Sequence, residues 1–133
     1  TDLRFLASDL CVPATGADGV EDIDPAGRHA CIVLARPKTG RWHQIRQHLA
    51  NSLGHPILGD STHGLSRTNR IWRGRGMMKE RVCLHLAHVE LPPSEYSPQG
   101  ISSICPIPND MMDLIKSQMP NLLENKSITL LSA

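Results

Sequence analysis

The chain has 133 residues, of which 40% are hydrophobic and 3% aromatic, and its formal net charge is +1. This length and composition suit a single domain with a core of its own. A transmembrane helix is excluded because no run of about eighteen apolar residues occurs. The first residues, TDLRFLASDL, also lack the basic start and apolar stretch of a signal peptide.

Two strands separated by a loop are predicted in the first part of the chain. Residues 3–10 predict an edge strand, and residues 13–29, rich in Pro, Gly and Asp, predict a solvated loop. The apolar, partly β-branched residues 30–35 predict a central, buried strand. Pro37 ends this strand, because proline cannot donate to a sheet ladder.

A helix is predicted next, from Thr39 as N-cap to about Leu53. Ile45, Leu49 and Leu53 recur at four-residue intervals and are expected to face the core. Gly54 suits a left-handed helix end, and the proline two positions later prevents continuation.

The following segment, residues 61–81, is basic and shows no sustained periodicity. Within it, Arg73–Gly76, next to Trp72, resembles a flexible RNA-contacting segment. Residues 82–91 alternate between apolar and polar side chains, which predicts a strand.

A last helix is predicted to begin at Asn109 or Asp110 and to end at Met119, with its methionines filling the core. The predicted elements indicate an α+β domain with a mixed or antiparallel sheet over residues 1–120. A loosely ordered tail is expected at 121–133.

The four cysteines are far apart and form no CxxC pair. This spacing favours reduced thiols in an intracellular compartment, cytoplasmic or organellar, over a disulfide framework or a zinc site. Cys31 and Cys83 lie in apolar runs and are expected to be small core residues.

Charge is strongly segregated along the chain. Residues 36–81 hold ten of the 14 Lys and Arg residues and only two of the 13 Asp and Glu residues, which gives this segment +8 and the remainder −7. Such a local excess is typical of a surface that binds nucleic acid or phosphate. A merely solvated basic face is the alternative.

Arg41 and Arg46 fall near the predicted start of the first helix, where the helix dipole favours anions. Their guanidinium groups suit phosphate, and Arg46 could alternatively hold a carboxylate ionised in a pocket. No metal site is predicted, because His43 and His48 would lie about 140° apart around a helix. No serine occurs in a nucleophile elbow.

The order TGR-x-HQIR-x-H, GHPI-x-GD and R-x-x-LH resembles the C-terminal half of the RluA-type pseudouridine synthases. GDSTHG and the later RVCLH run are most similar to the tRNA-modifying TruC branch of that family. The resemblance runs over residues 2–93 and is most specific from Lys38 to Gly64. It implies isomerisation of uridine to pseudouridine in RNA, with tRNA favoured over rRNA, and no cofactor or metal.

The resemblance also implies roles for individual residues. Arg46 corresponds to the arginine that pairs with the family's catalytic aspartate, and Leu84 corresponds to the apolar residue that packs against the target uracil. The side chains expected to contact RNA are Lys38, Arg41, His43, Gln44, Arg67, Arg70, Arg73, Arg75 and Arg81.

The family's nucleophilic aspartate belongs to an HRLD-type motif, which this chain does not contain. Asp60 is predicted to be a turn residue and not a substitute. We therefore expect part of a synthase, shortened by truncation or splicing, that is inactive by itself. The alternatives are a non-catalytic RNA-binding module derived from a synthase and an unstable half-domain with an exposed sheet edge.

Overall fold

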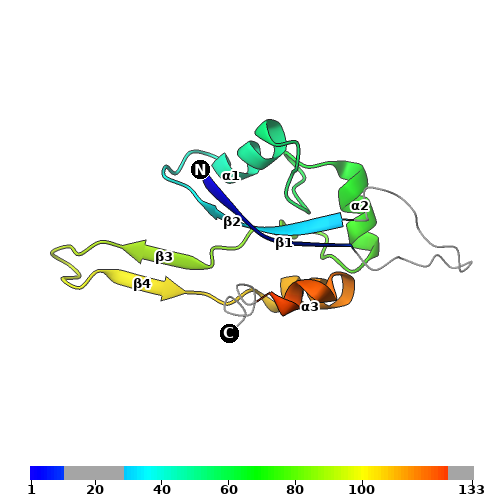
Figure 1. The fold of residues 1–133 in the computed structure, drawn as a ribbon. Coiled ribbons are helices and arrows are strands. Elements are labelled where there is room, and N and C mark those ends of the chain that lie inside the picture. Colours follow the sequence, from blue (N-terminus) through cyan, green and yellow to red (C-terminus); the bar gives the residue numbers. More distant parts are fainter. Residues whose placement is uncertain (11–28, 126–133) are drawn as a thin grey trace, which may run out of the picture.

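The computed structural model describes residues 1–10 and 29–125. Within them the predicted α+β class is confirmed, with three α-helices and two antiparallel sheets of two strands each (Figure 1). The loop predicted at 13–29 lies outside the described residues, except for His29, which begins a strand.

Strands β1 (Asp2–Leu10) and β2 (His29–Arg36) pair in antiparallel orientation. Both strands are predicted by the sequence, but the prediction that the second is central and buried is wrong. In the described part of the chain β2 has β1 as its single partner, and Leu34 remains 41% exposed. Cys31 is likewise exposed and is not a core residue.

Helix α1 (Gln44–Gln47) continues directly into one π-helical turn, η2 (His48–Ser52). The prediction that Thr39 caps this helix is wrong. His43 has a left-handed backbone, with φ of 49°, and a residue in this conformation cannot continue an α-helix toward the N-terminus. The helix therefore begins only after it.

The end of this helical segment is partly as predicted. Leu53 is 52% exposed and does not face the core, because the wider π turn changes the angular spacing that a four-residue interval assumes. Gly54 has a left-handed φ of 70°, which confirms its predicted conformation.

A second helix, α2 (Ser66–Gly74), occupies the segment that showed no periodicity in the sequence. Its buried residues are Asn69 and Trp72, which are three positions apart and share one face. Because one of these two buried residues is polar, the apolar spacing that signals a helix is missing, and the sequence predicts no helix here.

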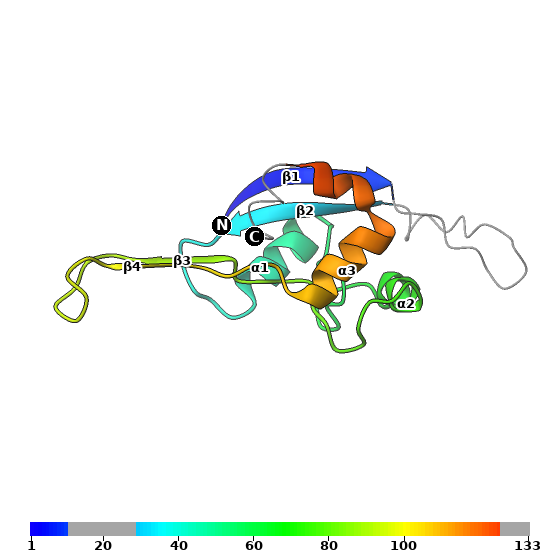
Figure 2. The same cartoon turned by 90° about the horizontal axis from the view of Figure 1, so that it is seen from below.

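Strands β3 (His88–Leu91) and β4 (Ile101–Ile104) form a hairpin that projects from the rest of the molecule (Figures 1 and 2). The strand predicted at 82–91 is present only in its last four residues. The Leu84 N–H donates to the Val82 carbonyl at 2.7 Å, and this tight turn interrupts the extended run.

Helix α3 (Asn109–Gln118) confirms the predicted C-terminal helix, and a 3-10 turn, η3 (Pro120–Glu124), follows it. Leu122 is only 2% exposed, so packing continues past residue 120, where a loose tail is predicted. Residues 126–133 of that tail lie outside the described part. The core residues are Trp72, Met77, Leu114, Ile115, Met119 and Leu122.

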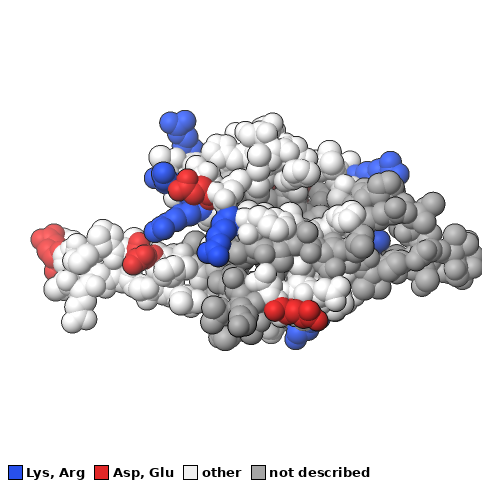
Figure 3. Space-filling model, viewed as in Figure 1, with Lys and Arg blue, Asp and Glu red and all other residues white. Residues whose placement is uncertain are grey.

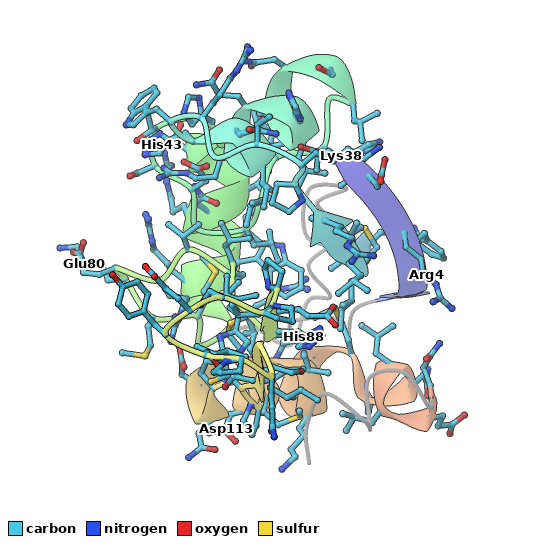
Figure 4. The ribbon with its side chains drawn as sticks, turned by 90° about the vertical axis from the view of Figure 1, so that its left-hand side faces the viewer. Arg4, Lys38, His43, Glu80, His88 and Asp113 are labelled. Atoms are coloured by element: carbon cyan, nitrogen blue, oxygen red, sulfur yellow. The ribbon has the colours of Figure 1, made fainter. Side chains whose placement is uncertain are left out.

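The core lies between the helices and one face of the first sheet. Ala30 and Ile32 of β2 pack against it from the sheet side. Figure 4 shows the β1–β2 sheet on one side, α2 on the other, and α1 and α3 at opposite ends between them. The HQIR motif, which includes the start of α1, therefore lies at one end of this arrangement.

Candidate functional site

The loop before α1 is organised by the side chain of Gln44. Its Oε1 accepts hydrogen bonds from the Thr39 hydroxyl at 2.7 Å and from the Arg41 N–H at 3.1 Å. Its Nε2 donates to the Thr1 hydroxyl at 3.0 Å. Gln44, predicted to contact RNA, therefore uses its amide to hold this loop, while the Arg41 side chain beside it remains exposed.

Arg46 and Asp60 form a bidentate ion pair. Arg46 Nε donates to Asp60 Oδ2 and Nη2 donates to Oδ1, each at 2.7 Å. The Asp60 side chain is fully buried, and that of Arg46 is 17% exposed. Arg46, expected from the resemblance to pair with an aspartate outside this chain, thus already binds a carboxylate within it.

Asp60 also shapes its own loop, as predicted. Its Oδ1 accepts the backbone N–H groups of Thr62 and His63, both at 2.9 Å. The prediction of a turn residue is thus correct but incomplete, because the same carboxylate fixes the Arg46 guanidinium.

The loop that carries Asp60 is held by Asn69 of α2. Asn69 Nδ2 donates to the Asp60 carbonyl at 2.9 Å, and its Oδ1 accepts the Gly59 N–H at 2.8 Å. A Cβ atom at Gly59 would overlap the Arg81 carbonyl, and one at Gly64 would overlap the Asp60 carbonyl. Asn69 lies within the segment that resembles the tRNA-modifying branch, but the sequence predicts no role for its side chain.

The ion pair determines the protonation of both groups. Hydrogen bonds from Arg46 hold the pKa of Asp60 well below its usual value, against the desolvation that raises it, and the N–H groups of His63 and Thr62 lower it further. The same pairing raises the pKa of Arg46. Asp60 is therefore an ionised, fully engaged carboxylate that positions Arg46 and does not transfer protons.

His43 extends the ion pair toward the surface. Arg46 Nη1 lies 2.9 Å from His43 Nε2, and this nitrogen must accept because a guanidinium only donates. The imidazole proton is then on Nδ1, which donates to His63 Nε2 at 3.0 Å. Desolvation lowers the pKa of His43, the charges of Arg46 and His63 lower it further, and Asp60 opposes this, so the neutral form is favoured.

Several of the predicted RNA-contacting cations are exposed, namely Lys38, Arg41, Arg67 and Arg70. Lys38 lies 3.5 Å from Asp2, with both side chains largely in solvent. Figure 3 shows Lys and Arg side chains gathered where the N-terminus and α1 lie, with acidic side chains next to some of them.

Arg81, another predicted contact, has a different environment. Its Nε and Nη2 donate to the carboxylate of Asp110 at 2.5 and 2.6 Å. The pairing raises the pKa of Arg81 and lowers that of Asp110. The structure thus places Arg81 in a packing contact that attaches the segment before β3 to the first turn of α3.

Arg73 and Arg75 lie at the end of α2 and are half-buried. The Arg75 guanidinium lies 5.5 Å from the ring centroid of Trp72, which is fully buried. Arg73 and Lys79 line a hollow of about 240 Å³ beside Gly59. The prediction of a flexible Gly/Arg segment is therefore wrong, since this segment packs on the core.

Leu84, predicted to pack against the uracil, is 41% exposed. Its neighbour Cys83 donates its N–H to the Leu58 carbonyl at 2.9 Å, directly before Gly59 and Asp60. Leu84 thus presents apolar surface on a segment attached to the loop of the ion pair. Burial raises the pKa of the Cys83 thiol to about 11, which agrees with its predicted core position and not with a reactive thiolate.

Three further observations concern other kinds of site. Within residues 1–10 and 29–125, no three His, Cys, Asp or Glu side chains come together to hold a metal ion. Among the same residues no helix is long and apolar enough to cross a membrane. Cys31, Cys83 and Cys105 are free thiols.

Known proteins resemble part of this chain. A tRNA pseudouridine synthase C of Vibrio cholerae is 44% identical over 59 residues, which make up 44% of this chain and 23% of that protein. The protein of the same name from Salmonella typhi is 44% identical over 80 residues, or 57% of this chain and 30% of the relative. An uncharacterized RNA pseudouridine synthase of Zymomonas mobilis is 36% identical over 83 residues, which make up 62% of this chain and 33% of the relative.

The chain spans no more than about a third of the length of these relatives. No family profile and no solved structure matches it. The similarity predicted from the HQIR and GD motifs to the tRNA-modifying synthases is thus confirmed for part of the chain.

Proposed function

We propose that this chain is the C-terminal portion of the catalytic domain of an RNA pseudouridine synthase, and that its substrate is tRNA. The observation that carries the proposal is the Arg46–Asp60 ion pair, which joins the HQIR motif to the GHPI-x-GD motif. Relatives named tRNA pseudouridine synthase C support the choice of RNA.

In the proposed site, Arg46 serves a second carboxylate that this chain does not contain. A guanidinium has five N–H groups, and the contacts with Asp60 and His43 use three of them. One N–H on Nη1 and one on Nη2 therefore have no partner among the described residues. These donors can hold the nucleophilic aspartate ionised in a partly desolvated pocket, since an opposite charge offsets the desolvation penalty.

The family's reaction assigns the remaining steps to that aspartate. The target uridine is flipped out of its stack, the aspartate assists cleavage of the N-glycosidic bond, and the base is rotated and rejoined through carbon. In this scheme Leu84 supplies an apolar wall for the uracil. The chain by itself is expected to be inactive, because the HRLD-type motif is absent from its 133 residues.

The RNA would be bound mainly through its phosphates. Arg41, Arg67 and Arg70 are exposed cations within the segment whose net charge is +8. Each phosphate neutralised by such a cation releases counterions, so affinity falls as salt rises.

A salt titration of tRNA binding tests this proposal. The purified chain should bind tRNA with an affinity that falls linearly on a log–log plot against salt, and Arg70→Gln should reduce the slope by about one. Lys116→Gln is the matched control, because this exposed cation on α3 lies outside the basic segment. Absent or salt-independent binding would contradict the proposal.

A second candidate is a non-catalytic RNA-binding module derived from a synthase. It is favoured by the exposed cations remaining in a chain without the HRLD-type motif. The two candidates differ in what the gene encodes upstream of Thr1 in the same reading frame. The synthase proposal expects an HRLD-type motif there, whereas its absence would favour the module.

A further inference from the structure

Trp42 combines exposure with a fixed position. The residue is 68% exposed, yet its ring stacks on His43 with centroids 3.8 Å apart and an interplanar angle of 20°. The edge of His63 approaches it with a centroid distance of 5.8 Å and an angle of 70°. The indole thus stacks on an imidazole, and its 68% exposure leaves ring surface accessible to a ligand.

The imidazole behind Trp42 is itself immobilised. His43 accepts a hydrogen bond from Arg46, donates one to His63 and adopts a left-handed backbone. Through Arg46 it is connected to the fully buried Asp60. The Trp42 carbonyl also accepts the side-chain N–H of Gln47 at 3.2 Å. Few rotations therefore remain to be frozen when a ligand stacks on the exposed face.

The surroundings indicate what that ligand is. The exposed cation Arg41 precedes Trp42 in the chain, and His43 lies at the same end of the molecule as Lys38, far from Asp113 of α3 (Figure 4). An aromatic face next to cations binds single-stranded nucleic acid by stacking a base while the cations hold the backbone. Every base has a π-face, so such stacking tolerates different sequences.

We propose that Trp42, supported by His43, is a stacking platform for one unpaired nucleobase of the bound RNA. This inference rests on the proposed RNA-binding function and adds to it a contact that does not involve phosphate. Trp42 is then a residue that distinguishes unpaired from paired RNA, since a base inside a duplex has no free face.

The test compares a short oligouridylate with the same sugar–phosphate strand lacking its bases. The chain should bind the oligouridylate more tightly, and Trp42→Ala should weaken that binding about 5- to 100-fold while leaving the binding of the abasic strand unchanged. The salt dependence should not change, because the phosphate contacts remain. Trp42→Phe should retain part of the affinity.

Two internal controls accompany this test. Tyr96 is 91% exposed on the loop of the β3–β4 hairpin, and Tyr96→Ala should leave both affinities unchanged. Trp72 is fully buried, so its emission in Trp42→Ala reports that the variant is folded, and oligouridylate should quench only the emission of Trp42.

Two results would overturn the platform, and they are distinguishable. If the wild-type chain binds both strands with the same salt-dependent affinity and Trp42→Ala changes nothing, the platform is rejected while the proposed RNA binding stands. If neither strand nor tRNA binds at any salt concentration, the proposed function fails and the platform fails with it.

Discussion

Asp60 accepts two hydrogen bonds of 2.7 Å from Arg46, and it does so from a fully buried position fourteen residues further along the chain. The two residues belong to separate sequence motifs, which this contact converts into one site. Because Asp60 is already engaged by four hydrogen bonds, its role is to orient Arg46. Under the proposed function, the two N–H groups of Arg46 that bind neither Asp60 nor His43 are the donors for the nucleophilic aspartate.

Asp60→Asn should lower the free energy of unfolding by about 3 kcal/mol, because the largely buried Arg46 guanidinium then has no negative charge to pair with. Urea unfolding measures this change. Asp110→Asn breaks the more exposed pair with Arg81 and should cost only about 1 kcal/mol. Equal losses in the two variants would show that the buried Arg46–Asp60 pair stabilises the fold no more than the Arg81–Asp110 pair does.

Gly59→Ala should destabilise the fold by more than about 2 kcal/mol. The new Cβ would overlap the Arg81 carbonyl, and the φ of 81° is strained for alanine. Gly74→Ala is the matched control, because a Cβ there meets nothing within 4 Å, and it should change stability by less than about 1 kcal/mol. Thermal unfolding of the two variants compares them, and a small effect at Gly59 would mean that the loop can move away.

Acidification should destabilise the fold through His43. Its pKa is lowered in the folded chain by desolvation and by Arg46, so the unfolded chain binds more protons in the window just below the ordinary histidine pKa of about 6.5. Stability is complete above that value and declines as pH falls through the window. His43→Asn, which tolerates the left-handed backbone, should lose this part of the pH dependence of the urea midpoint. Identical pH profiles in the wild-type chain and in His43→Asn would contradict the claim that folding favours the neutral form of His43.

Arg81→Gln should separate packing from RNA binding. Its guanidinium is bound to Asp110, so the variant should lose about 1 kcal/mol of stability and keep the salt slope of tRNA binding. A reduced salt slope of tRNA binding with unchanged stability would instead support the RNA contact that the sequence predicts for Arg81.

The sequence predicts those parts of the structure that depend on local patterns. The strand at β1, the helix at α3 and the left-handed Gly54 follow from apolar spacing and from turn chemistry, which are properties of neighbouring residues. Helix α2 could not be predicted in this way, because one of its two buried anchors is the polar Asn69, whose partners belong to another loop.

The same limit applies to the site. HQIR and GD are recognisable as motifs, but their contact depends on the path of the chain through Gly59, which only the folded structure shows. Likewise, Arg81 and Arg70 are both basic residues in one basic segment. Only the position of Asp110 separates a packing arginine from an exposed one.

The central claim is that this chain contributes the arginine and the RNA surface of a pseudouridine synthase without the nucleophile. The most direct measurement is tritium release from tRNA labelled at C5 of uridine, since that carbon loses its hydrogen when it joins the sugar. The assay uses chain whose salt-dependent tRNA binding has been verified, so that inactivity cannot reflect misfolding. We predict no release above background, and tritium release by the 133-residue chain would contradict the account.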